Sequence, residues 1–95
     1  MLKHVVMYRL KDKTPEVIKT IKTNFAGMEG KIPGLIKVES GEDVLRSARS
    51  FDYCLVCVFD GRASLEAYQT HPAHLPVKAF MKTVVESSVA VDFEF

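Results

Sequence analysis

Hydrophobic and polar residues alternate with a period of two near both ends of the chain, a pattern typical of β-strands. We predict strands over residues 2–10 and 87–94 on this basis. Residues 35–41 form another β-rich stretch. Residues 51–59, Phe-Asp-Tyr-Cys-Leu-Val-Cys-Val-Phe, are apolar at both odd and even positions and predict a strand with two apolar faces.

A helix is expected to follow the first strand. Thr14 offers a hydroxyl as N-cap, Pro15 suits the first helical position, and the helix dipole favours the carboxylate of Glu16. Gly30 and the Pro-Gly pair at 33–34 should end this helix. The apolar residues that would face the core recur with helical spacing: Val17, Ile18, Ile21, Phe25 and Met28.

The segment between the last two strands predicts a broken helix. The turn at Asp60-Gly61 leads into a short helix from Arg62 to about Thr70. The tetrapeptide His-Pro-Ala-His at 71–74 then interrupts the helical pattern, and a second helical piece ends near Val85.

The predicted element order is β-α-β-β-α-β, with a polar loop at residues 42–50 between the middle strands. This order indicates an α+β fold of the ferredoxin-like type, an antiparallel four-stranded sheet with helices on one face. Internal repeats, low-complexity tracts and linkers are absent from the sequence. We therefore expect one domain over residues 1–95.

The face of the sheet without helices would still be apolar. The residues of the third strand alternate between the two faces: Tyr53, Leu55 and Cys57 against Cys54, Val56 and Val58. An apolar surface across four strands exceeds the patch of several hundred Å² that monomers usually expose. A second copy of the sheet is the expected cover, which predicts a homodimer through the sheet faces.

Composition excludes two classes of partner. The net charge is +1, without the clustered basic face that nucleic acid requires. Charged residues make up 26% of the chain and no run approaches transmembrane length, so we expect no membrane association. The chain opens directly on a strand pattern rather than on a signal peptide, which favours a cytoplasmic protein.

Cys54 and Cys57 have the spacing of a redox or zinc motif, but they lie inside a strand. Positions three apart on a strand point to opposite faces, so the two thiols should diverge. We interpret both as small hydrophobic residues.

Titratable groups converge on the stretch from Tyr68 to His74. It contains two of the three histidines of the chain, His71 and His74, on either side of Pro72. Histidine changes its charge near neutral pH, so this turn is where we expect any proton-transfer chemistry.

The chain resembles the Dabb family, the stress-responsive α/β-barrel domain proteins, essentially from end to end. The resemblance is carried by the order and spacing of five segments: Lys3 to Asp12, Ile32-Pro33-Gly34-Leu35, Val58-Phe59-Asp60, Tyr68 to His74, and Val89 to Phe93. It implies a dimeric barrel in which two sheets pack face to face. Many members are known only as stress-induced proteins.

One plant type within this family is a polyketide cyclase of the olivetolic acid type, which closes a ring without a cofactor. The resemblance places its catalytic pair at Tyr68 and His74, and a pocket histidine at His4. Tyr53 stands where that cyclase has a further histidine. Pro76 also departs from its pattern and is expected to bend the start of the last helix.

The resemblance leaves three roles open for His74. As a general base it would take a proton next to a carbonyl, with Tyr68 holding the oxyanion. As a structural residue it would close the turn by a local hydrogen bond, and as a binding residue it would hold a ligand without turnover. We interpret His71 as a cap of the following helix. His4 is either a satisfied sheet histidine or part of the pocket.

We predict no cofactor and no metal site. His4 and His74 lack an evident carboxylate partner and make a weak ligand set for zinc. Some plant relatives hold a magnesium ion largely through backbone oxygens near the start of the second strand. Such a site has no side-chain signature, so residues 33–38 neither support nor exclude it.

A small, mostly apolar cavity is expected between sheet and helices. The strand residues chosen for it share one alternation phase within each strand. Its expected lining is His4, Val6, Tyr8, Phe25, Leu55, Cys57, Tyr68, His74 and Ala90. These observations favour a dimeric barrel of unassigned biochemical role that binds a small apolar or aromatic ligand. The alternatives are a cyclase-like lyase that uses the His74–Tyr68 pair and, more weakly, a cofactor-free oxygenase.

Overall fold

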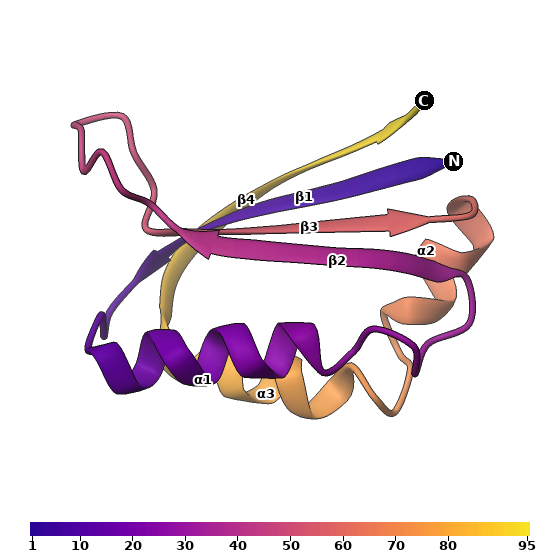
Figure 1. Ribbon diagram of the computed structural model, residues 1–95, viewed down its shortest axis with the longest axis horizontal. Coiled ribbons are helices and arrows are strands. Elements are labelled where there is room, and N and C mark those ends of the chain that lie inside the picture. The colour runs from indigo at the N-terminus through magenta and orange to yellow at the C-terminus, as the bar shows by residue number, and fades with distance from the viewer.

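The computed structural model describes residues 1–95 and has the predicted ferredoxin-like fold, a four-stranded antiparallel sheet with three helices on one face (Figure 1). The strands are β1 (Leu2–Leu10), β2 (Leu35–Glu42), β3 (Tyr53–Phe59) and β4 (Val85–Glu94). The helices are α1 (Pro15–Ala26), α2 (Arg62–Tyr68) and α3 (Leu75–Val84). The strand order in the sheet is β2-β3-β1-β4.

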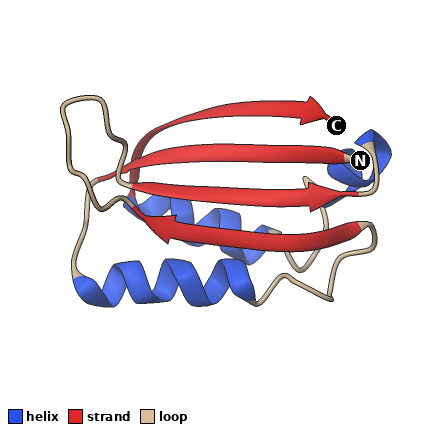
Figure 2. Cartoon of the chain, turned by 45° about the horizontal axis from the view of Figure 1, so that its top comes forward, coloured by secondary structure: helices blue, strands red, loops and turns tan.

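The register of the ladders decides which residues face the helices. Val6 of β1 pairs with Leu55 of β3 on one side and with Ala90 of β4 on the other. Directly paired residues lie on the same face of a sheet, so these three share the helix-bearing face. Helices α1 and α3 run side by side beneath this face, and α2 lies at the end where β3 finishes (Figures 1 and 2).

Helix α1 begins as predicted but ends earlier. The Thr14 hydroxyl accepts a hydrogen bond from the N–H of Val17 at 3.4 Å, and Pro15 occupies the first turn. The helix ends at Ala26 rather than at residue 30 or beyond, with Gly27 as its C-cap. Met28 follows the helix end but is still fully buried, with 1% exposure.

The helical segment after β3 is broken as predicted, with α2 and α3 separated by residues 69–74. Pro76 lies within the first turn of α3, where a missing N–H costs no intrahelical hydrogen bond. The expectation that Pro76 bends the helix start is therefore wrong. His74 is the N-cap residue of α3 by backbone position, but its side chain makes no capping hydrogen bond.

Strand β3 starts two residues later than predicted, at Tyr53. Asp52, just before it, forms hydrogen bonds with the backbone of β1. Its carboxylate accepts a hydrogen bond from the N–H of Leu10 at 2.8 Å, and its own N–H donates to the carbonyl of Tyr8 at 2.8 Å. Strand β4 starts at Val85, directly after α3, and its pairing with β1 shifts register between Arg9 and Leu10.

The core lies between the sheet and the helices. Its largest fully buried side chains come from both layers: Phe25 and Ile21 of α1, Tyr53, Leu55, Cys57 and Phe59 of β3, Tyr68 of α2, and Met28. The two cysteines are free and lie on opposite faces of β3, as the strand pattern predicts, with Cys57 buried and Cys54 half-buried. Burial raises the pKa of the Cys57 thiol to about 12, which keeps it protonated.

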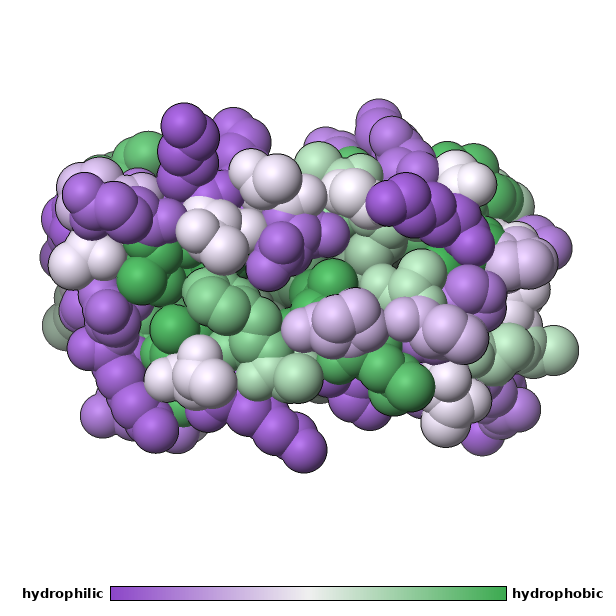
Figure 3. Space-filling model, turned by 90° about the horizontal axis from the view of Figure 1, so that it is seen from below, coloured by the Kyte–Doolittle hydropathy of each residue, from purple (hydrophilic) through white to green (hydrophobic).

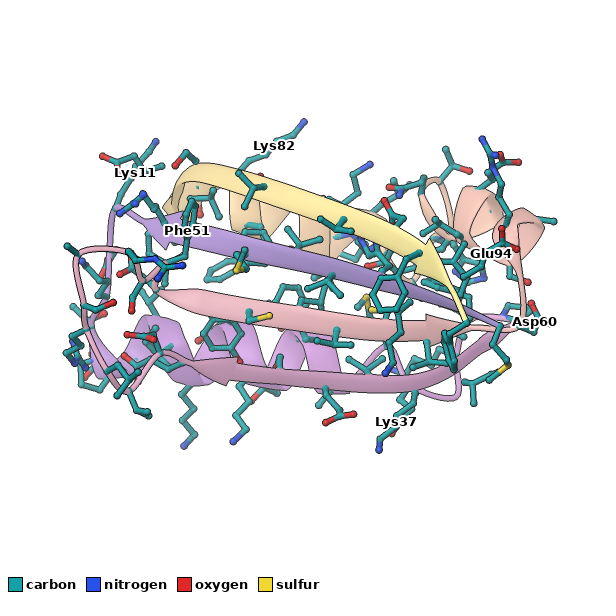
Figure 4. The ribbon with its side chains drawn as sticks, turned by 90° about the horizontal axis from the view of Figure 1, so that it is seen from above. Lys11, Lys37, Phe51, Asp60, Lys82 and Glu94 are labelled. Carbon is teal, nitrogen blue, oxygen red and sulfur yellow. The ribbon has the colours of Figure 1, made fainter.

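The other face of the sheet carries no helix and is apolar. Val5 of β1 pairs with Val56 and Val91 across this face. Seen from above, hydrocarbon side chains occupy its middle (Figure 4). The charged side chains labelled in that view project around the outline of the sheet rather than over its middle: Lys11, Lys37, Asp60, Lys82 and Glu94. Large apolar side chains of β1 and β4 remain exposed on it, at 40% for Met7, 46% for Val89, 61% for Val91 and 45% for Phe93.

None of the three helices is both long and apolar enough to cross a membrane.

Candidate functional site

A pocket of about 400 Å³ opens between α3 and the β1–β4 side of the sheet. Six of the nine residues expected in a cavity line it: His4, Val6, Tyr8, Phe25, Tyr68 and His74. The first three follow one another at alternate positions of β1, Phe25 comes from α1, and the last two stand on either side of the turn between α2 and α3. The turn and the first strand therefore meet in one site.

The remaining three expected residues lie outside the lining. Leu55 and Cys57 are buried in the core, with exposures of 1% and 0%, and Ala90 is exposed on the edge strand β4. Alternation along a strand predicts which face a side chain occupies. It does not predict how far the helices extend across that face, so the lateral position of the pocket could not be deduced from it.

Helix α3 supplies most of the lining that the sequence did not reveal. The further lining residues are Gln69, Val77, Lys78, Met81, Lys82, Val85 and Ser88. Those on α3 recur three or four positions apart from His74 onward, which is the spacing of one helix face. That periodicity was the available signal for them. The helix-bearing side of the molecule has an apolar band through its middle with polar residues around it (Figure 3).

His74 lies deep in the site. Its ring stacks on that of Tyr68, with centroids 3.9 Å apart and an interplanar angle of 26°. Its Nδ1 lies 3.4 Å from Sδ of Met28, and a thioether sulfur only accepts hydrogen bonds. Nδ1 therefore carries the proton, and Nε2 keeps a lone pair.

The charge state of His74 follows from its surroundings. Burial lowers its pKa to about 4, and the positive charge of Lys78 acts in the same direction. The imidazole is thus neutral at pH 7. Because its basicity is well below that of a free histidine, it is a better hydrogen-bond partner than proton acceptor in the unliganded protein.

Tyr68 is the least satisfied polar group of the site. Its side chain is 1% exposed, and its hydroxyl is buried with only the thiol of Cys57, a weak hydrogen-bond partner, beside it and no hydrogen bond of standard geometry. Burial also raises the pKa of this phenol, so the hydroxyl stays protonated and is available as a donor. A buried hydroxyl left unpaired is costly, which makes it a position where a ligand oxygen would be stabilised.

His4 is held by a carboxylate that the sequence did not reveal. Its Nδ1 contacts Oδ1 of Asp92 on β4, the residue directly opposite it in the ladder. The pairing fixes Nδ1 as the donor and leaves Nε2 of His4 free on the pocket side. The ring of His4 also meets that of Tyr68 edge-on, with centroids 6.0 Å apart. The alternation of β4 and its antiparallel pairing with β1 together would have indicated Asp92.

His71 does not reach the pocket. Its Nδ1 accepts a hydrogen bond from the N–H of Ala73 at 3.0 Å, and its carbonyl accepts from the N–H groups of His74 and Leu75. His71 therefore closes the turn that precedes α3. It leaves His74 as the only histidine of the turn that lines the pocket.

The structure contains no cluster of three or more His, Cys, Asp or Glu side chains that could hold a metal ion. The carboxylate beside His4 is engaged by that imidazole, and His74 faces Met28 on its Nδ1 side. None of the side chains of residues 33–38 carries an oxygen atom, so only backbone oxygens could bind a magnesium ion there.

Solved structures with the same fold include proteins of different activities. A dimeric ferredoxin-like protein of unknown function from Thermobifida fusca is 28% identical, with a TM-score of 0.89 over 99% of this chain and 90% of that one. The hydroxynitrile lyase of Passiflora edulis is 16% identical, with a TM-score of 0.83 over 97% and 90%. SnoaB, a cofactor-independent oxygenase of Streptomyces nogalater, is 15% identical, with a TM-score of 0.75 over 99% and 91%.

At these identities the two enzymes share the fold with this chain and nothing further is implied. No curated protein matches the chain significantly. The family model described as the Stress responsive A/B Barrel Domain matches residues 2–95. The chain belongs to this family, Dabb.

Proposed function

We propose that this protein binds a small, mostly apolar or aromatic molecule that presents an oxygen to the Tyr68 hydroxyl. The observation that carries this proposal is Tyr68, which lines an otherwise largely apolar pocket and whose buried hydroxyl has only the weak Cys57 thiol as a partner. A volume of about 400 Å³ lies within the usual range of small-molecule sites. The rings of Phe25 and Tyr8 lie 6.0 Å apart between centroids at an interplanar angle of 26°, and both line the pocket without filling it.

We also propose that two copies associate through the open sheet face. This would cover the exposed side chains of Met7, Val89, Val91 and Phe93, and the relative from Thermobifida fusca is described as dimeric. The pocket lies on the opposite face of the sheet. Each protomer would therefore keep its own ligand site.

A second candidate function is cofactor-independent proton transfer on a carbonyl compound, as in a cyclase-like lyase. The favouring observation is the stack of His74 on Tyr68, with a neutral imidazole that retains its Nε2 lone pair. His74 would remove a proton from carbon, and Tyr68 would donate a hydrogen bond to the enolate oxygen. A structural relative is named a hydroxynitrile lyase, so the same fold occurs in a lyase.

The binding function can be tested by thermal shift against a panel of phenols, aromatic ketones and polyketide-like compounds. A ligand at about 100 times its Kd should stabilise the protein by about 2.7 kcal/mol, a readable shift for a domain of this size. Tyr68→Phe should weaken any binder that carries an oxygen. Absence of binding across the panel would contradict the proposal.

Turnover of a binder separates the two candidate functions. If the protein is an enzyme, His74→Ala should remove turnover, and Tyr68→Phe should reduce it by about 10²-fold or more. His71→Asn is the matched control, because it keeps an acceptor for the Ala73 N–H and alters no pocket residue. If the unmodified protein binds the compound without converting it, only the binding function is supported and the enzymatic one is contradicted.

A further inference from the structure

The pocket wall carries positive charge without compensation. Lys78 and Lys82 both line the pocket, and none of its lining residues is an aspartate or glutamate. Neither lysine takes part in any of the five ion pairs of the structure. Asp92 does not line the pocket, and its carboxylate is paired with the imidazole of His4.

The two lysines and His74 form one row along α3. They are spaced four residues apart, so they lie on the same face of the helix. With a rise of 1.5 Å per residue, Lys78 lies about 6 Å and Lys82 about 12 Å along the axis from His74. The row therefore runs from the buried imidazole to the rim of the pocket.

The row also changes in accessibility along its length. Lys78 is half-buried, and its Nζ donates a hydrogen bond to the carbonyl of Gln69 at 3.1 Å, which leaves further N–H donors free. Lys82 is exposed and extends outward past β4 (Figure 4). One ammonium group is thus held in place beside the pocket, and the other is free to move toward a ligand.

We propose that the ligand is an organic anion, a phenolic or other oxygen-bearing aromatic carboxylate. Its ring would lie among the apolar residues with its oxygen at Tyr68, and its carboxylate would lie between the ammonium groups of Lys78 and Lys82. This inference rests on the proposed binding function and adds the charge and approximate length of the molecule. A neutral analogue would place no negative charge between the two ammonium groups.

Charge at His74 supports the same orientation. Lys78 is one of the groups that lower the pKa of His74, so the positive charge of this lysine acts on the imidazole. A carboxylate bound at Lys78 would offset this charge. The imidazole would then accept a proton more readily with the ligand present than without it. Binding of the carboxylate at the lysines would therefore raise the pKa of His74.

Matched acid and amide pairs test the proposal directly. The probes are 4-hydroxybenzoate, 4-hydroxyphenylacetate and 3-(4-hydroxyphenyl)propionate, each against its primary amide, in calorimetric titrations at low ionic strength. The acid of the best pair should bind about tenfold more tightly than its amide. This ratio should shrink as salt is added, because exposed charges are screened.

Substitutions then test whether Lys78 and Lys82 cause the preference for the acid over the amide. Lys78→Gln and Lys82→Gln should each weaken the acid about threefold or more and leave the amide unchanged. Lys19→Gln is the matched control, since Lys19 is an exposed lysine of α1 that lines no part of this pocket. If all three substitutions weakened binding of the acid equally, the effect would come from net charge alone. That result would overturn the proposal.

The two levels of inference fail in different ways. Equal affinity for acid and amide, with Tyr68→Phe weakening both, would overturn the anion proposal and support the binding function. Failure of every acid and every amide to bind would count against both.

Discussion

The imidazole of His74 lies almost flat against the phenol ring of Tyr68, with ring centroids 3.9 Å apart. Tyr68 is the last residue of α2, and His74 precedes the first residue of α3. The turn closed by His71 folds the chain back between them. Two residues six positions apart thereby become one buried unit, and a change to either ring should be felt by the other.

The pKa of His74 should be near 4 by NMR titration of its imidazole, because burial disfavours the charged form. The unfolded chain takes up this proton near pH 6.5, before the folded protein does. Stability from this group is therefore complete above pH 6.5 and falls as the pH drops toward 4. The loss should reach roughly 3 kcal/mol.

His74→Gln should remove most of this acid-dependent loss, because glutamine does not titrate. His71→Asn, outside the pocket, should leave the loss in place. Chemical denaturation of the three proteins between pH 4 and 7.5 provides the comparison. An unchanged pH profile in the His74 variant would mean that another group controls acid stability.

Tyr68→Phe should leave stability within about 1 kcal/mol of the original protein or raise it, because the hydroxyl removed has only the weak Cys57 thiol beside it as a partner. Tyr53→Phe is the matched control in the same core. Its hydroxyl shares a 2.9 Å hydrogen bond with the Ser40 hydroxyl, so its removal should cost about 0.5–1.5 kcal/mol. Urea denaturation measures both. A larger loss for Tyr68→Phe than for Tyr53→Phe would show that the Tyr68 hydroxyl is structural.

Gly34→Ala should destabilise the protein much more than Gly30→Ala. Gly34 and Gly30 have positive φ angles of 82° and 81°, so alanine would strain the backbone to a similar extent at both positions. A Cβ at Gly34 would lie 2.0 Å from Oγ of Ser64, whereas one at Gly30 would meet nothing within 4 Å. We expect a loss of about 1 kcal/mol at Gly30 and several kcal/mol at Gly34 by thermal denaturation. Equal losses would contradict the steric explanation.

Val91→Asp should dissociate the proposed homodimer while the protomer stays folded. Val91 is 61% exposed in the protomer, so a charge there is costly only where a second sheet covers it. Ala90→Asp, also exposed but on the opposite face of β4, is the control and should remain dimeric. Analytical ultracentrifugation at micromolar concentration decides the matter. The original protein should sediment as a dimer that buries about 1,200–2,000 Å². A monomer would contradict the dimer proposal.

Much of the fold was predictable because it depends on local patterns. The alternation of Val89, Val91 and Phe93 indicates a strand, and Thr14-Pro15 marks a helix start that the structure contains. Helix and strand ends were less certain where a tertiary contact fixes them. Asp52 lies outside β3 because its carboxylate binds the backbone of β1, which no pattern within residues 51–59 could show.

The sequence by itself indicated the candidate site residues Tyr68, His74 and His4, through the titratable groups gathered at residues 68–74 and through the family resemblance. Only the tertiary structure decided what surrounds them. The antiparallel register of β1 and β4 sets Asp92 opposite His4. The placement of α3 brings Lys78 and Lys82 to the pocket and leaves Leu55 and Cys57 in the core. Periodicity specifies the face on which a side chain lies, whereas packing between distant segments specifies its neighbours, and the neighbours set its charge and its access to a ligand.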